Sequence, residues 1–128
     1  MATVYPTSAM QFLIDLLDPS NGQAKLVNIF CGWGTGAGTA VIGNTTLFTE
    51  AAEARVAVAS TQQTTTETGD TYQGIATITS ASTQTITNAG LFTASSGGVM
   101  LLKGDFAGIA LVNGDKIEFT CKHQQKNV

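Results

Sequence analysis

The amino-acid sequence predicts an all-β protein, specifically a jelly-roll-like β-sandwich or barrel that carries one short N-terminal helix. Roughly seven or eight apolar runs recur about every eight to twelve residues, with Gly, Asn or Ser turns between them, as is typical of sandwiches and barrels. The chain is rich in threonine, whose β-branched side chain favours pleated sheet. A Greek-key, immunoglobulin-like arrangement is the second prediction.

The last third of the chain, residues 83–122, has the clearest strand pattern. Three apolar runs are separated by glycine turns, and the Asn-Gly-Asp sequence at 113–115 favours a tight hairpin, because a type I′ turn needs positive φ at both central residues. After this turn, Ile117, Phe119 and Cys121 alternate with polar residues, so one face of this strand packs on a core. We expect residues 109–112 to be its hairpin partner.

The N-terminal part, residues 1–22, is predicted to be an arm followed by a short helix. Thr7 or Ser8 can cap a helix whose apolar stripe includes Phe12 and Leu16. An Asp-Pro pair and then an Asn-Gly pair end this helix, since the residue before a proline is pushed out of the helical region. The helix is too short to be stable unless it packs on the rest of the protein.

A chain of 128 residues has the usual length of one domain, so a single domain, 1–128, is predicted. We expect the β-sandwich in residues 23–122 and a polar tail in residues 123–128. In residues 25–33 apolar side chains occur at both odd-numbered and even-numbered positions, which indicates a strand that is buried on both faces. Residues 44–60 fit both a helical stripe and a strand, and we interpret them as a turn into a strand that begins near Glu53. Residues 62–69 contain no apolar side chain, so they are expected to form an exposed loop or a solvated strand tip, followed by a strand in 71–80.

A glycine-rich stretch, Gly32-Trp33-Gly34-Thr35-Gly36-Ala37-Gly38-Thr39, follows the first predicted strand. It lacks both the dinucleotide fingerprint and the phosphate-binding lysine motif, so nucleotide binding is disfavoured. We interpret it as a loop whose glycines permit positive φ and close approach of the backbone. Trp33 is then an anchor, either in the core or at a contact with a partner.

Composition and charge limit the partners that this protein can have. The net charge is −3 and only 12% of residues are charged, which argues against nucleic acid, because binding to phosphates needs clustered Lys and Arg. No run is long and apolar enough to span a bilayer, and the N-terminus lacks the features of a secretion signal. The surface must be covered largely by uncharged polar groups, which cost little to desolvate and suit adhesion to neighbouring proteins.

The residues offer little catalytic chemistry. We expect no enzyme activity, no cofactor, no metal site and no small-molecule substrate. Cys31 and Cys121 are expected to be buried free thiols, and His123 to be solvated in the polar tail. Two of the carboxylates could meet in space; the candidates are Asp70, Asp105, Asp115 and Glu118. Asp105 and Asp115 each follow a glycine, so turn-type hydrogen bonds are favoured for both.

Several stretches resemble small structural proteins of tailed bacteriophages. They are Thr85-Ile86-Thr87-Asn88-Ala89-Gly90-Leu91-Phe92, Ser96 to Phe106, Val112 to Thr120, Gly32-Trp33-Gly34-Thr35-Gly36, and Leu47-Phe48-Thr49-Glu50 followed by Arg55. The resemblance spans about residues 31–120. It implies a virion component, either a capsid cement (decoration) protein or a module of the tail tip or tail fibre.

An acidic, weakly charged chain suits the outside of a capsid, whereas a protein facing the genome is expected to be basic. We therefore expect a cement protein on the capsid surface of the virion, made in the host cytoplasm, that binds the major capsid protein and stabilises contacts between its subunits. A homotrimer or other cyclic oligomer is expected, because closing a ring makes the remaining contacts intramolecular. The alternatives are a tail-tip or tail-fibre module for host attachment and a carbohydrate-processing enzyme on the virion.

The contact surfaces are expected in the N-terminal arm with its helix, the glycine-rich loop and the polar loop near residues 64–68. The candidate interface residues are Tyr5, Phe12, Leu16, Trp33, Thr35 and Thr65.

Overall fold

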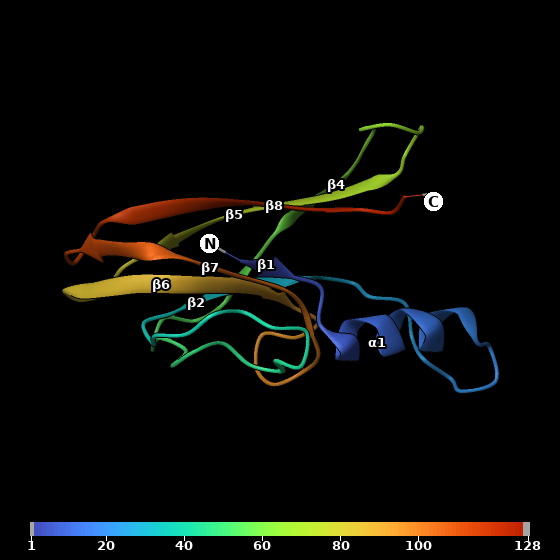
Figure 1. Ribbon diagram of the computed structural model, residues 1–128, viewed down its shortest axis with the longest axis horizontal. Helices are drawn as coiled ribbons and strands as arrows, with labels where there is room; N and C mark the ends of the chain where they lie inside the picture. The colour runs from blue at the N-terminus through green and yellow to red at the C-terminus, as the bar shows by residue number, and fades with distance from the viewer. Residues whose placement is uncertain (1, 127–128) are drawn as a thin grey trace.

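The computed structural model describes residues 2–126 and contains two antiparallel sheets packed face to face (Figure 1). The large sheet has the order β1-β7-β6-β2-β3 and the small sheet the order β4-β5-β8. The elements are β1 (Thr3–Val4), α1 (Thr7–Leu17), β2 (Phe30–Gly34), β3 (Val56–Ala57), β4 (Ala59–Gln63), β5 (Thr71–Thr79), β6 (Gln84–Phe92), β7 (Met100–Leu111) and β8 (Lys116–Gln124). The predicted all-β sandwich with one N-terminal helix is confirmed.

The predicted hairpin at Asn113-Gly114 is wrong. β7 and β8 lie in different sheets, and the partner of β8 is β5, in a continuous register from Thr79↔Lys116 to Thr71↔Gln124. The turn does form, with Gly114 at φ 95°, but backbone hydrogen bonds tie it to Ser80 at the end of β5. The turn therefore carries the chain from one sheet to the other. Local turn chemistry predicts a reversal of the chain, but it does not say which strand each arm will pair with.

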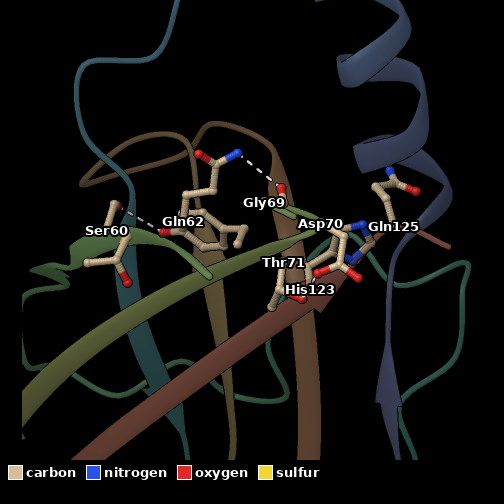
Figure 2. Close-up of a pocket in the computed structure, with 9 residues that line it drawn as sticks. Ser60, Gln62, Gly69, Asp70, Thr71, His123 and Gln125 are labelled. Atoms are coloured by element: carbon tan, nitrogen blue, oxygen red, sulfur yellow. Dashed lines mark hydrogen bonds between the residues drawn. The ribbon is translucent and has the colours of Figure 1, made fainter. Parts of the chain in front are cut away.

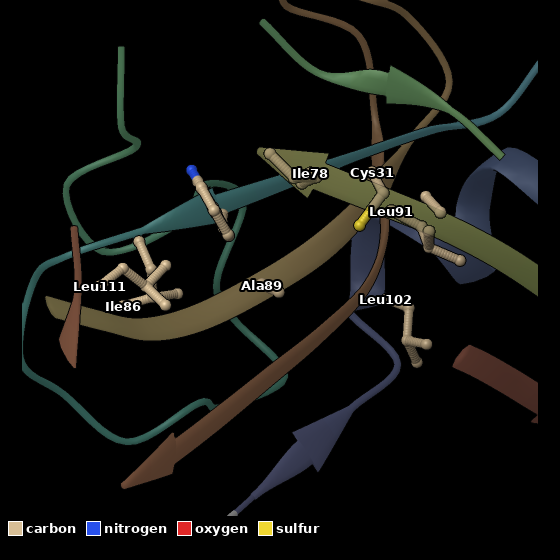
Figure 3. Close-up of a cluster of buried hydrophobic side chains, with 9 residues drawn as sticks. Cys31, Ile78, Ile86, Ala89, Leu91, Leu102 and Leu111 are labelled. Atoms are coloured by element: carbon tan, nitrogen blue, oxygen red, sulfur yellow. The ribbon is translucent and has the colours of Figure 1, made fainter. Parts of the chain in front are cut away.

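The main core fills the space between the two sheets (Figure 3). Its buried residues are Cys31, Trp33, Ala76, Ile78, Ile86, Ala89, Leu91, Leu102 and Leu111. Trp33 meets the Phe119 ring edge-on, with 6.2 Å between centroids, and donates a hydrogen bond from Nε1 to Glu53. Cys31 on β2 and Cys121 on β8 are both free; Cys31 is buried, as predicted, whereas Cys121 is only half-buried. Contact with the Cys121 thiol and burial both raise the pKa of Cys31.

Residues 35–55 cover the other face of the large sheet and form a third layer. Asn88 of β6 bonds both the N–H and the C=O of Phe48, at 2.9 and 3.0 Å. Lys103 of β7 is 0% exposed; its ammonium donates to the Thr46 carbonyl at 2.8 Å and lies 3.2 Å from the centre of the Phe48 ring. The backbone at Gly36 passes so close to Phe48 that no side chain fits, because a Cβ at Gly36 would lie 2.8 Å from the Phe48 carbonyl carbon.

Helix α1 begins at Thr7, but neither Thr7 nor Ser8 caps it. Pro6 holds the N-cap position in an extended conformation, and the helix start has no side-chain hydrogen bond. The helix ends at Leu17, just before Asp18, as predicted. No helix in the described part of the chain is long and apolar enough to cross a membrane.

The strand predicted for residues 25–33 begins only at Phe30. Ile29 continues the pairing with the segment after β3, because its carbonyl accepts a hydrogen bond from the Val58 N–H. Residues 26–29 also line an open pocket with Ser60 and Tyr72 of the small sheet. The strand expected near Glu53 appears as β3 and β4, so the helical alternative for residues 44–60 is excluded. Of the predicted exposed loop or solvated strand tip at 62–69, Gln62 and Gln63 form the exposed end of β4 and the rest forms the loop before β5.

Candidate functional site: a polar pocket beside the β4–β5 hairpin

An open pocket of about 460 Å³ lies on the small sheet, beside the hairpin that rises away from the large sheet (Figures 1 and 2). All of its lining residues come from β4, from the turn and start of β5, and from the end of β8 and the segment after it. They are Ser60, Thr61, Gln62, Gly69, Asp70, Thr71, Tyr72, His123 and Gln125.

The strand register builds the centre of this pocket. Tyr72 is paired with Gln62 on one side and with His123 on the other, so these three residues form one row across the sheet. The Tyr72 hydroxyl lies 3.0 Å from Ser60 Oγ. Gly74 provides the space for this ring, because a Cβ there would lie 2.7 Å from the Tyr72 hydroxyl oxygen.

Asp70 organises the hairpin loop. Its carboxylate accepts hydrogen bonds from the backbone N–H groups of residues 65, 66 and 67 at 2.9, 3.0 and 3.1 Å. It also accepts one from the Gln124 side chain at 2.7 Å and one from the Thr71 hydroxyl at 2.9 Å. The bonds from Gln124 and the loop N–H groups hold the pKa of Asp70 well below its usual range, because they stabilise the carboxylate. This carboxylate is fully occupied in shaping the loop.

His123 is half-buried, and the prediction of a solvated histidine is wrong because β8 continues to Gln124. The His123 ring stacks on Tyr5, with 4.5 Å between centroids, and burial lowers the pKa of the imidazole. Its Nε2 is buried without a hydrogen-bond partner among the described residues. Tyr72 and His123 also line an apolar cavity of about 210 Å³ whose other walls include α1 and Leu102. This pair therefore separates the polar pocket from an apolar interior.

Across residues 2–126, His123 has no hydrogen bond to a carboxylate, and no three His, Cys, Asp or Glu side chains are grouped to hold a metal ion. Apart from the Asp70 carboxylate, which the loop hydrogen bonds occupy, and the His123 imidazole, the polar groups of the pocket are hydroxyls, side-chain amides and one phenol. Such groups can bind a neutral polar ligand through hydrogen bonds that both donate and accept.

Two of the other candidate carboxylates, Asp115 and Asp105, have structural roles, whereas Glu118 is exposed. Asp115 accepts a hydrogen bond from the Val112 N–H within its turn, as predicted. The turn predicted for Asp105 is wrong, because this residue lies inside β7. Its carboxylate accepts the N–H groups of Ala40 and Ala2, which lower the pKa of Asp105 and tie the N-terminal arm and the third layer to the large sheet.

The predicted interface residues fall into three groups. Tyr5 and Thr65 flank the pocket, through His123 and Asp70 respectively. Phe12 and Trp33 are 6% and 1% exposed and belong to the protein's own interior. Leu16 and Thr35 are partly exposed and lie elsewhere.

Four pocket residues were not predicted from the sequence: Ser60, Gln62, Tyr72 and Gln125. The alternation of Ile117, Phe119 and Cys121 extends to His123, and this signal could have placed His123 on the inner face of the last strand.

A second exposed feature lies on helix α1. Met10, Ile14 and Leu17 are 55%, 64% and 78% exposed, and their spacing places them on one side of the helix. Ile42, 66% exposed, lies beside the helix start, where its carbonyl accepts the Thr7 N–H at 2.9 Å. We call Met10, Ile14, Leu17 and Ile42 the α1 stripe.

The sandwich fold, the open pocket and the exposed apolar stripe together are typical of a binding or structural module. The model of a protein family described as podophage GP4 fiber I protein gp80 matches residues 8–125. The chain belongs to this family, and it is a bacteriophage structural protein. The predicted resemblance to phage structural proteins is confirmed at that level. No curated protein matches the sequence.

Proposed function

We propose that this protein is a fibre module of a phage virion that contacts the host surface, with the polar pocket as the binding site for a neutral saccharide. The family description, which names a fibre protein, supports the fibre alternative over the capsid cement that composition favours. The observation that carries the saccharide assignment is the set of hydroxyl and amide groups around the Tyr72 ring; the one carboxylate in the lining, Asp70, is already hydrogen-bonded within its loop.

Saccharide hydroxyls both donate and accept hydrogen bonds, so they match side-chain amides and hydroxyls better than they match ions. Gln62 donates from Nε2 to the Gly69 carbonyl at 3.0 Å, which fixes the amide and leaves its oxygen as an acceptor. The Gln125 side chain is exposed and has no hydrogen bond within the described chain, so it is available to a ligand. Tyr72 supplies an aromatic surface with an apolar body and a polar end.

Binding of labelled protein to host cells and to polysaccharide extracted from the host envelope tests this function. We expect Gln125→Ala to weaken binding roughly fivefold, the loss of about one hydrogen bond. Gln23→Ala is the matched control, because Gln23 is exposed and does not line the pocket. The proposal fails if wild-type protein binds neither target, or if Gln125→Ala binds as well as Gln23→Ala.

The α1 stripe favours a second candidate, a capsid cement protein that forms a homotrimer and docks on the major capsid protein. Exposed apolar residues in a row are typical of a surface that packs against another protein. This candidate requires hundreds of copies per virion, whereas a fibre requires a few dozen at most. Quantifying the protein in purified particles separates the two. Ile14→Ala, which changes the stripe without removing a buried residue, should then weaken capsid attachment and lower the temperature of DNA release.

A further inference from the structure

Strand β4 is a free edge of the small sheet, and it lacks the features that protect such edges. Edge strands in monomers usually carry charged residues, proline or a bulge, because unpaired backbone groups attract other strands. The sequence of β4 is Ala59-Ser60-Thr61-Gln62-Gln63, and no charged residue occurs from Val56 to Thr66. All five side chains of β4 are exposed.

The other sheet edges differ from β4. β8, the opposite edge of the small sheet, carries Lys116, Glu118 and Lys122, all exposed. The edges of the large sheet, β1 and β3, are two residues long each. Among the edge strands of the described chain, β4 is therefore the one that is longer than two residues and carries no charged side chain.

The backbone of β4 is only half used within the subunit. Its pairing with β5 covers all five residues, from Ala59↔Ile75 to Gln63↔Thr71. In an antiparallel ladder, alternate residues point their N–H and C=O groups to one neighbour and the rest to the other side. On that other side, no described residue forms a backbone hydrogen bond with β4, and residues 26–29 lie near Ser60 across an open pocket.

We propose that β4 pairs antiparallel with β4 of a second copy of this chain, joining two small sheets into one. A two-fold contact requires a surface that is complementary to itself, and a neutral polar strand meets this requirement, whereas a charged one would repel its copy. Two residues that pair across the axis must both be odd-numbered or both be even-numbered, because only alternate residues direct their N–H and C=O groups outward. The register that overlaps all five residues places Thr61 opposite Thr61 of the second copy.

This pairing has a consequence for the pocket. Ser60, Thr61 and Gln62 line the pocket and belong to the paired strand. The two pockets of a dimer would therefore lie on either side of the two-fold axis. Two neighbouring sites on one rigid sheet would strengthen attachment to a repeating ligand without any new contact. The pairing itself depends only on the sheet edge, and it stands whether or not the pocket binds saccharide.

A charge exchange at Thr61 tests the proposal. Thr61→Lys and Thr61→Asp each place like charges face to face across the two-fold axis, so each variant alone should dissociate to monomers in sedimentation velocity experiments. Mixed in equal amounts, the two variants should form a heterodimer, because opposite charges then meet. Thr77→Lys is the matched control: Thr77 is exposed on the central strand β5, opposite Glu118, and this variant should remain dimeric.

Circular dichroism of each variant checks that the fold is retained. Restored dimerisation in the mixture supports the two-fold contact at β4 and shows that both variants are folded. A wild-type chain that is monomeric throughout a concentration series would overturn the proposal. An assembly that survives both substitutions, or two folded variants that fail to associate when mixed, would overturn it as well.

Discussion

The guanidinium carbon of Arg55 lies 3.5 Å from the centre of the Phe92 ring. The same side chain forms a two-bond contact with Glu50, at 2.6 and 2.9 Å, and donates to the carbonyls of Ala94 and Gly97 at 3.0 and 2.8 Å. The Arg55 side chain is 8% exposed. Arg55 therefore ties the third layer to the end of β6 and to the loop between β6 and β7.

Replacing this arginine should weaken that connection. We expect Arg55→Lys to lower the free energy of unfolding by about 2 kcal/mol, because a single ammonium cannot reproduce the planar set of four hydrogen bonds. Urea denaturation measures the change. Lys25→Ala removes an exposed charge and should stay within about 0.5 kcal/mol of wild type. Equal stabilities for the two variants would contradict the structural role of Arg55.

Asp70 should make stability depend on pH. Its folded pKa is depressed, so its contribution is fully present above the ordinary pKa of aspartate, about 3.9, and is lost as the pH falls through the folded value. We expect the melting temperature to fall as the pH drops below about 4, and Asp70→Asn to make this fall shallower. Asp15→Asn is the control, because the Asp15 carboxylate has no hydrogen bond within the described chain. Identical acid profiles for wild type and Asp70→Asn would rule out this role.

Gly90 should not tolerate a side chain. A Cβ at this position would lie 2.7 Å from the Leu102 carbonyl oxygen, which belongs to the paired strand β7 and cannot move freely. We expect Gly90→Ala to destabilise the protein by about 2 kcal/mol or more. Gly43→Ala serves as the comparison, since a Cβ there meets nothing within 4 Å. Thermal unfolding of both variants checks the difference, and an unaffected Gly90→Ala would show that the two strands can separate at low cost.

Helix α1 has one face that stabilises the subunit and another that does not. Phe12 is 6% exposed, so Phe12→Ala should lower the free energy of unfolding by about 3 kcal/mol. Ile14 is 64% exposed, and Ile14→Ala should leave the stability of the isolated chain within about 0.5 kcal/mol. Guanidinium denaturation of the two variants makes the comparison. A large loss with Ile14→Ala would mean that the α1 stripe is already covered in solution.

Much of the fold could be predicted because its signals are local. The alternation around Phe119 places one face of a strand on a core, and the Asp-Pro pair ends the helix at the predicted place. The pairing of β8 could not be predicted in this way. The strands on both sides of the Asn113-Gly114 turn have an apolar face. Each strand can bury this face whether the two strands pair with each other or lie in opposite sheets.

The candidate site was less predictable than the fold. Tyr5 and Thr65 were expected at an interface, and they do flank the pocket, but Gln62 and Tyr72 have no unusual local sequence. They become neighbours of His123 only through the register of three strands, two of which are separated by about fifty residues. Buried polar residues such as Lys103 were also missed, because the segment that satisfies them is distant in the sequence.

The sequence by itself determined the β character of this protein, its low charge, its short helix and its likeness to phage structural proteins, because composition and alternation act through each residue's nearest neighbours. Only the tertiary structure decided which strands share a sheet, where the pocket lies and which edge is left free. These features depend on contacts between segments far apart in the chain, and such contacts are selected by the packing of the whole sandwich.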